Sequence, residues 1–482
     1  FAGVNGVPRE HGDMENFGLS PRLGMTVAIN DGTVLRAGYG LFYAPWNFSN
    51  SSQGQIGFTR NTSMTQSDSA TEIPTTALDN PFPSGLQTPV GATLGLLTGI
   101  GGSVSYVDDT KDSGIVHQYS IDMQRELTND MAVTFGYTGA TARDIGFCGS
   151  NSGCSININQ VRPSVAKSEF PSGTGWDADS MRASTANPFY GAASAGEYKT
   201  AATIPMYRLL QAFPQFKNVN VLEMNAGGRR QYHALIFKLD KRTGNSAWGG
   251  RFSYTLSNTK DNQWGQSTSF ASRTATPQNA FDMVKGEYAS SIFESPHRVI
   301  LAPILRIPGP AEGSAAYPIF GGWTASAVVQ LVSGAPLNAV MSSSNSSTNC
   351  ANACGRQRPN KIGDPNTAGD DLSRVAYTGN TDARWFKSAA FSSPGKGSLG
   401  GAPRTITAAR YQFRKNIDMV IAKDTEVGGG AVAQVRFEIL NLTNTAKFGG
   451  VSSNSIGSST FGRVTQQVGF MRIWQLSFRL TY

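Results

Sequence analysis

The 482-residue sequence predicts an all-β protein whose antiparallel strands form a transmembrane β-barrel with long extracellular loops. Three observations predict this fold class. Apolar and polar residues alternate in eleven segments, the connections between the segments are short and long in turn, and charge is confined to one side of the alternation. Because successive side chains of a strand point to opposite faces, each segment would have one apolar face and one polar face.

The alternation is clearest in the last segment, residues 470–482. The side chains that would share its apolar face are Trp474, Leu476, Phe478, Leu480 and Tyr482. The segment ends on an aromatic residue at the chain terminus, as the closing strand of a bacterial outer-membrane barrel does. We therefore expect these five residues to form the C-terminal strand used in barrel assembly.

Ten further segments pair into five hairpins. They cover residues 23–29 and 35–43, 119–123 and 131–137, 235–239 and 248–256, 299–307 and 323–331, and 417–421 and 435–439. Asn30-Asp31-Gly32 and the three glycines 428–430 are strong turn signals. Pro303 interrupts one segment and makes it the weakest of the set, because proline cannot donate a ladder hydrogen bond.

The connections alternate strictly in length. Short ones lie at 30–32, 127–130, 243–247, 308–322 and 425–430, and long ones at 44–116, 140–230, 259–296, 334–414 and 442–469. If the C-terminus is periplasmic, every long connection is extracellular, which is the asymmetry of outer-membrane barrels. Long structureless loops are uncommon in a compact soluble domain, so the pattern favours a membrane protein.

Charge separates the two faces of the predicted strands. The apolar face is charged only at strand ends, as at Lys241 and Lys423. The opposite face carries Arg36, Asp122, Lys238, Asp240, Arg251, Arg436 and Glu438. A lysine or arginine facing lipid at the bilayer centre costs about 2–4 kcal/mol, whereas a wet lumen wall tolerates charge. We expect these seven residues to line the lumen, where Lys238/Asp240 and Arg436/Glu438 form wall ion pairs or contact a plug or substrate.

Composition limits the other classes. Only 15% of residues are charged and no apolar run approaches about 18 residues, which excludes helical membrane spans. The net charge of +8 is scattered and accompanies no nucleic-acid-binding motif, so no nucleic-acid partner is expected.

The four cysteines form two local pairs, Cys148 with Cys154 and Cys350 with Cys354. Each pair lies in a stretch rich in glycine, serine or asparagine, and this spacing predicts two disulfide-closed loops in an oxidising compartment. A zinc site is the alternative, but neither spacing matches the usual C-x2-C.

No catalytic constellation stands out. The four histidines are dispersed, and neither a zinc-protease helix motif, a nucleophile elbow nor a phosphate-binding loop is present. Asp108, Asp109 and Asp112 fit a solvated loop better than a calcium site. We therefore expect no enzyme activity, no cofactor and no metal.

Several stretches also resemble a known family. They include PRLGMTVAINDGTVLRAGYGLFY (21–43), HQYSIDMQREL (117–127), YHALIFKLDKR (232–242), SPHRVILAPIL (295–305) and VRFEILNLTN (435–444). As a set, in this order and spacing, they resemble the C-terminal barrel half of TonB-dependent receptors, and within them the Oar-like subgroup.

The resemblance implies a barrel of roughly twenty-two strands, filled by an N-terminal plug and opened by a TonB-type energy-coupling protein. Residues 1–482 would then be the C-terminal part of the barrel, and the plug and the N-terminal strands would lie outside this chain. The implied function is import of a siderophore, carbohydrate or peptide across the cell outer membrane. The alternatives are an outer-membrane anchored adhesive or structural protein that binds a partner through its loops, and a passive porin.

Overall fold

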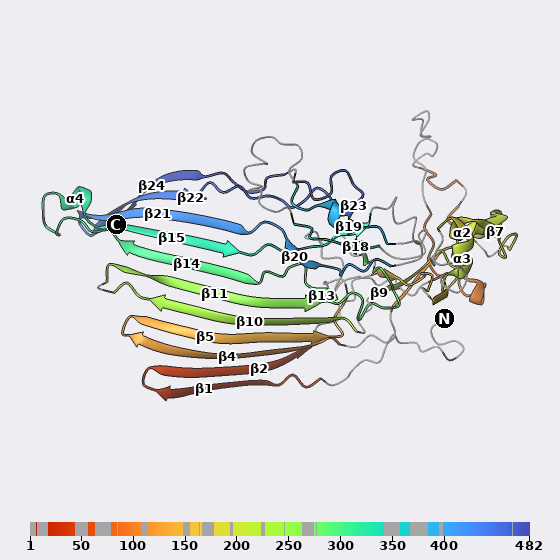
Figure 1. Ribbon diagram of the computed structural model, residues 1–482, viewed down its shortest axis with the longest axis horizontal. Coiled ribbons are helices and arrows are strands. Elements are labelled where there is room, and N and C mark those ends of the chain that lie inside the picture. The colour runs from red at the N-terminus through yellow and green to blue at the C-terminus, as the bar shows by residue number, and fades with distance from the viewer. Residues whose placement is uncertain are drawn as a thin grey trace, which may run out of the picture.

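One large antiparallel sheet organises the molecule (Figure 1). The computed structural model describes residues 6, 18–43, 56–62, 79–83, 85–107, 113–147, 155–162, 164–165, 178–192, 196–222, 227–244, 246–262, 274–275, 277–341, 357–366, 384–394, 399–464 and 466–482. Across these ranges, no helix has the length and the apolar character needed to cross a membrane.

Eleven long strands form the sheet, and each pairs with the next one in sequence. They are β1 (Arg22–Asn30), β2 (Thr33–Tyr43), β4 (Ile115–Thr128), β5 (Met131–Arg143), β10 (Arg229–Lys241), β11 (Trp248–Asp261), β14 (His297–Arg306), β15 (Trp323–Val332), β21 (Arg414–Gly428), β22 (Ala431–Leu440) and β24 (Ile473–Thr481). A short strand, β13 (Ala289–Ser290), extends the pairing of β11. The predicted eleven strands and five hairpins are confirmed.

The turn residues act as their chemistry predicts. In the first hairpin, the backbone N–H of Gly32 donates to Asn30 Oδ1 at 3.1 Å, which closes the turn between β1 and β2. In the last hairpin, Gly429 and Gly430 have φ angles of +64° and +81°. Only glycine adopts such angles freely, so the glycine run fixes where β21 reverses into β22.

Pro303 does not end its strand. β14 runs through Pro303 and pairs with β11, where Pro303 lies opposite Gly250. The φ of Gly250 is +141°, and a Cβ there would overlap the Ala302 carbonyl oxygen. On the other side, the ladder with β15 skips from Leu301 to Ile304. The disturbance predicted for Pro303 is therefore local, because a glycine on the neighbouring strand makes room for it.

The strand register aligns the apolar residues into rows across the sheet. One such row runs through Val27, Leu35, Met123, Phe135, Phe237, Tyr254, Val299 and Leu331. We call this side of the sheet the apolar face and the opposite side the charged face. Side chains on the apolar face stay exposed, including Phe135 (54%) and Leu476 (73%). The described residues thus leave this face uncovered, unlike the face of a soluble sandwich.

The connections are segregated by length. Figure 1 shows the hairpin turns, the short helix α4 (Tyr317–Phe320) and the C-terminus at one end of the sheet, and the long connections at the other. We call these the turn end and the loop end. The strict alternation of short and long connections in the sequence therefore corresponds to two distinct ends of the molecule.

The long connections contain structure that sequence reasoning did not predict. Their strands are β3 (Ser103–Val107), β6 (Ser155–Asn157), β7 (Ser184–Ala186), β8 (Thr203–Pro205), β9 (Asn218–Leu222), β12 (Thr274–Ala275), β16 (Pro336–Leu337), β17 (Val340–Met341), β18 (Asn360–Lys361), β19 (Phe391–Ser392), β20 (Ile406–Arg410) and β23 (Ser455–Ile456). Their helical turns are η1 (Gly95–Leu97), α2 (Ala178–Arg182), η2 (Gly196–Thr200), α3 (Met206–Leu210) and η3 (Ser388–Ala390). We call the described parts of the long connections the cap. The expectation of structureless loops is therefore wrong for these parts.

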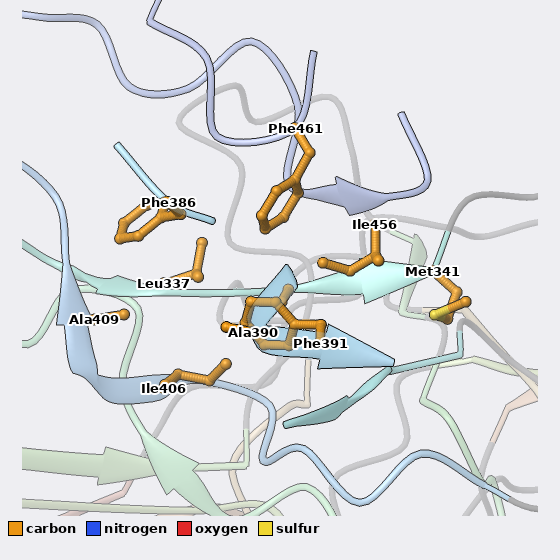
Figure 2. Close-up of a cluster of buried hydrophobic side chains, with 10 residues drawn as sticks. Leu337, Met341, Phe386, Ala390, Phe391, Ile406, Ala409, Ile456 and Phe461 are labelled. Atoms are coloured by element: carbon orange, nitrogen blue, oxygen red, sulfur yellow. The ribbon is translucent and has the colours of Figure 1, made fainter. Parts of the chain in front are cut away.

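The cap has an apolar core of its own (Figure 2). Its buried members come from connections 334–414 and 442–469: Leu337, Ala339, Met341, Phe386, Ala390, Phe391, Ile406, Ala409, Ile456 and Phe461. The rings of Phe391 and Phe461 meet edge to face, with centroids 5.8 Å apart. Two long connections, which the β21–β22 hairpin separates in sequence, are thereby packed into one unit at the loop end of the sheet.

Candidate functional site

Alternation places the seven predicted lumen charges on the charged face. Arg36 Nη1 lies 3.4 Å from Asp122 Oδ2 and donates to Gln124 Oε1 at 2.9 Å. Arg436 pairs with Glu438 on the same strand. Asp240 pairs with Arg251 Nε at 2.5 Å, because the register sets these two residues directly opposite each other. The Lys238/Asp240 pair expected from the sequence is therefore replaced by a cross-strand pair.

The predicted C-terminal strand is present in the structure. Trp474, Leu476, Phe478 and Leu480 lie on β24 and Tyr482 follows it, and all five are more than half exposed. Their exposure agrees with a lipid-facing position, and their role in barrel assembly stays a prediction.

All four cysteines lie outside the described residues: Cys148, Cys154, Cys350 and Cys354. Among the residues that the structure describes there is consequently no disulfide. The bridge from Cys148 to Cys154 and the bridge from Cys350 to Cys354 therefore stay predictions, as does the zinc alternative.

The acidic loop residues Asp108, Asp109 and Asp112 also lie outside the described residues. Within the described ranges, no group of three or more histidine, cysteine or acidic side chains could hold a metal ion. The remaining candidate sites are the cavities of the sheet and the cap.

A cavity of about 910 Å³ opens on the charged face at the loop end. Strands β14, β15 and β21 form its floor, and connections 334–414 and 442–469 form its walls. Its polar lining consists of the cations Arg298, Arg414 and Lys447, the amides Gln330, Gln412 and Asn416, and Tyr411. The described lining contains no carboxylate.

The strand register brings the two arginines of this cavity together. Arg298 on β14 lies opposite Val332 on β15, and Val332 lies opposite Arg414 on β21. The arginines thus flank one valine, about 10 Å apart at two strand spacings. Two residues further along these strands, on the same face, Gln330 lies opposite Asn416. Amide groups therefore line the cavity directly below the cations.

Connection 442–469 contributes Lys447 to the lining of the cavity. Gln412 holds this segment in place, because its Nε2 donates to the Ala446 carbonyl at 2.8 Å and its Oε1 accepts from the Phe448 N–H at 2.9 Å. The segment also donates from Gly449 N–H to the Gln466 carbonyl at 3.0 Å. Lys447 is thus positioned by a hydrogen-bonded loop.

The electrostatics of the cavity suit an anion. Three cations converge there, and the described salt bridges include none of them. Burial raises the pKa of Tyr411 to about 12, so its hydroxyl stays neutral near pH 7. The nearby Asp418 carboxylate accepts hydrogen bonds from Asn416 Nδ2 at 2.7 Å and from the Asn441 N–H at 2.8 Å. Arginine and lysine donors of this kind bind carboxylate or phosphate oxygens.

Three buried ion pairs hold the cap onto the end of the sheet. Arg358 Nη1 lies 2.5 Å from Glu287 Oε2, Arg404 pairs with Asp261, and Arg410 Nη2 lies 2.6 Å from Glu294 Oε2. Each joins connection 334–414 to residues 261–294. The three carboxylate side chains are almost completely buried, with exposures of 2% or less. We call these three pairs the clasp.

Glu287 is the member of the clasp that titrates near neutral pH. Burial raises its pKa from 4.5 to about 7, because desolvation outweighs the attraction of Arg358. Its other oxygen accepts from the Gln278 N–H at 3.1 Å. Burial also lowers the pKa of Arg404, which Asp261 opposes. The clasp therefore combines well-formed hydrogen bonds with a large desolvation cost.

Sequence reasoning missed the cavity and the clasp. Arg298 and Arg414 occupy the polar phase of their strands, so their face could be predicted, but their proximity depends on register. Lys447, Arg358 and Arg404 lie in long connections without periodicity. Only the fold of the cap brings them to the sheet.

The family of the chain follows from a comparison of sequences. The model of the family described as "Outer membrane beta barrel domain" matches residues 1–475. The chain belongs to the outer membrane beta barrel domain family. As in other outer membrane beta barrel domains, the apolar face of the sheet is the side suited to lipid and the charged face is the side suited to water. No curated protein sequence matches the chain significantly.

Solved structures similar to this outer membrane beta barrel domain include three transporters or receptors. The outer membrane transporter YddB from Escherichia coli is 7% identical with a TM-score of 0.41, over 93% of this chain and 38% of that one. The siderophore receptor PirA from Acinetobacter baumannii is 12% identical with a TM-score of 0.37, over 95% of this chain and 40% of that one. The ferric citrate transporter FecA in its unliganded form is 7% identical with a TM-score of 0.36, over 96% of this chain and 38% of that one. The chain thus spans about two fifths of the length of these proteins.

Proposed function

We propose that the protein is an outer-membrane TonB-dependent receptor that binds an anionic ligand and imports it. The observation that carries this proposal is the 910 Å³ cavity on the charged face, lined by Arg298, Arg414 and Lys447. A passive pore needs no such convergent site, whereas a receptor must hold its ligand before transport. The TonB-dependent step rests on the sequence resemblance of the hairpins.

The open edges of the sheet support a larger barrel. Among the described residues, β1 and β24 are the edge strands, and each pairs on one side only. An unpaired strand edge in lipid costs several kcal/mol for each backbone group, so a membrane sheet must close. We propose that further strands complete a barrel of roughly twenty-two, which is large enough to enclose a plug.

A second cavity provides a surface for such a plug. It occupies about 810 Å³ on the charged face near the turn end. Its lining carries charges of both signs, including Glu126, Asp240, Arg242 and Arg251. Mixed charge suits a polar protein surface better than a small anion. We propose that the plug contacts this region and that the ligand cavity lies on its loop-end side.

The anionic class can be tested by binding to the purified protein. We would measure the binding of ferric citrate and hexagalacturonate as anionic probes, and of maltohexaose and trialanine amide blocked at its N-terminus as neutral probes. We expect at least one anionic probe to bind, and the R298Q/R414Q/K447Q variant to bind it about 10-fold more weakly or worse. Binding of neutral probes only, of neither anionic probe, or equally by the variant would overturn the anionic assignment.

Energy coupling is tested in cells with the probe that binds. We expect its uptake to require the protein and to stop when a protonophore collapses the proton gradient. Uptake that persists with the protonophore would make the protein a passive pore. Binding without uptake, together with cell attachment that depends on the cap, would support the anchored adhesive protein in place of the receptor.

A further inference from the structure

We propose that the apolar face of β5, β10 and β11 binds the phosphate headgroup of a membrane lipid at the loop end. The inference depends on this face contacting the membrane and not on the proposed transport function. It rests on three features: a cationic row, a tyrosine–histidine pair nearer the apolar residues that is repeated on neighbouring strands, and a hollow with an apolar floor.

Polarity changes along β10 as it would across a membrane surface. From the loop end inwards, its apolar-face residues are Arg229, Gln231, His233, Leu235 and Phe237. The change from charged to apolar takes six residues, or about 20 Å at 3.3 Å per residue. On β11, the register sets Lys260 beside Gln231, Asn258 beside His233 and Leu256 beside Leu235. The neighbouring strand β11 thus follows the same profile in the same rows of the sheet.

The cationic row consists of Arg143 and Arg229, with Lys260 one row further in, and it lacks carboxylate partners that would stabilise it. Arg143 on β5 lies directly opposite Arg229 on β10, and like charges in that position destabilise a sheet. The guanidinium of Arg229 stacks 4.0 Å from the centre of the Tyr288 ring, and its Nη2 donates to the Val284 carbonyl at 3.1 Å. Its Nε is buried without a hydrogen-bond partner. Among the described ion pairs, none includes either arginine or the exposed Lys260.

Tyrosine–histidine pairs mark the boundary between polar and apolar residues. Tyr137 Oη lies 2.7 Å from His233 Nδ1, and their rings stack. Two other strand pairs repeat the arrangement with Tyr39 and His117 at 2.9 Å and with Tyr254 and His297 at 2.8 Å. Three of the chain's four histidines are therefore each hydrogen-bonded to a tyrosine on the neighbouring strand. They occupy three successive rows of the apolar face, with His117 in the row of Gln231 and His297 in the row of Leu235. Rings with one apolar and one polar end favour the membrane interface.

The hollow lies beside these residues: neither Arg143 nor Arg229 lines it, but its lining includes Tyr288, on whose ring Arg229 stacks. It has a volume of about 750 Å³, with Tyr137, His233, Leu235 and Leu256 on the strand side and Lys260 at its rim. Its lining also includes Glu294, whose carboxylate accepts from Arg410 Nη2 at 2.6 Å and from Asn258 Nδ2 at 3.0 Å. Because that carboxylate is already paired, the remaining charge of the rim is positive.

These features together fit a ligand that has both an anionic headgroup and an apolar chain. The cations supply donors for phosphate oxygens, as in basic sites that bind lipid headgroups. Leu235 and Leu256 are 43% and 39% exposed and would contact the start of an acyl chain. A free phosphate would leave that apolar floor uncovered, whereas an uncharged lipid would leave Arg143 and Arg229 opposed without an anion. A lipid whose phosphate headgroup carries a net negative charge satisfies both parts.

Native mass spectrometry of the purified protein with added lipid tests the assignment. We expect phosphatidic acid to be retained about 10-fold more than phosphatidylcholine, and millimolar inorganic phosphate not to displace it. The R143Q/R229Q variant should retain both lipids equally. The matched control is R230Q, which removes the neighbouring charge from the opposite face of β10 and should behave as wild type.

Three results would overturn the site. Equal retention of both lipids by the wild type would remove the lipid specificity, and displacement by inorganic phosphate would leave a simple anion site. A loss in R230Q equal to that in R143Q/R229Q would show attraction by net charge alone. Migration of unboiled protein on a denaturing gel verifies folding, and if the double variant fails to fold, R143Q and K260Q are tested singly with the same expected loss.

Discussion

Glu287 makes the stability of the cap depend on pH. Its pKa is about 7 in the folded cap against an ordinary 4.5, so the folded state binds this proton more tightly than the unfolded chain does. Stability from this group is therefore greatest below pH 4.5 and falls as the pH rises towards 7, by at most about 3 kcal/mol. We expect pulse proteolysis in urea to give a lower cap midpoint at pH 8 than at pH 5.

Replacement of Glu287 by glutamine provides the control for that pH dependence. Glutamine cannot ionise, so E287Q should show a cap midpoint that is nearly independent of pH between 5 and 8. The comparison isolates the slope from any uniform loss caused by leaving Arg358 without its carboxylate partner. A slope in E287Q equal to that of the wild type would assign the titration to another group.

At this scale, the sequence predicts the face of a residue but not its partner. Period-two alternation places Arg36, Asp240 and Arg251 on one face, as the structure has them. It gives no register, so it favoured Lys238 as the partner of Asp240 when Arg251 lies directly opposite. The clasp was beyond prediction for the same reason, because Arg358 and Glu287 meet only through the fold of the cap.

Among the elements, the cap should unfold separately from the sheet. Phe461 is fully buried in the cap core, and its replacement by alanine should destabilise the cap by about 3–5 kcal/mol. Limited proteolysis should then cut within 334–414 and 442–469 while the eleven strands remain protected. Phe470→Ala, at a residue that is 81% exposed, is the control and should leave the cleavage pattern unchanged. Loss of protection across the whole sheet would contradict a separate cap.

The two faces of one strand should respond differently to the same charge. Phe237→Lys places an ammonium group on the apolar face of β10 and should cost about 2–4 kcal/mol in lipid. Ile236→Lys places the same group on the charged face one residue away and should cost much less. Urea unfolding of the protein in vesicles, followed by tryptophan fluorescence, measures both. Similar losses in the two variants would remove the distinction between the faces.

The elements that could be predicted were those with local signals. Asn30-Asp31-Gly32 and the glycines 428–430 specify turns, and long alternation specifies strands, so all five hairpins followed from the sequence. The cap strands β16 to β19 have two residues each, too few for any period to show. Each also pairs with a segment of another connection or a distant part of the same one. Their existence depends on tertiary packing rather than on local pattern.

For the whole molecule, the dimensions of the apolar face agree with a membrane. On β10, eight residues separate His233 at the loop end from Lys241 at the turn end, or about 26 Å along the strand. Lys241 pairs with Asp130, and Lys423 donates to the carbonyl of Gly321, so both apolar-face lysines have polar partners at the turn end. A strand tilt of about 40° shortens this distance to roughly 20 Å, near the ~25 Å apolar band of outer-membrane barrels.

The central claim is that the apolar face contacts lipid and the charged face contacts water. Spin labels at successive positions 235–240 of β10, introduced as single cysteines after the four native cysteines are changed to serine, test it most directly in lipid vesicles. We predict that labels at 235, 237 and 239 collide with oxygen dissolved in the bilayer, and that those at 236, 238 and 240 collide with a water-soluble nickel chelate. Labels at 235, 237 and 239 that are shielded from both reagents would place this face inside a globule and contradict the account.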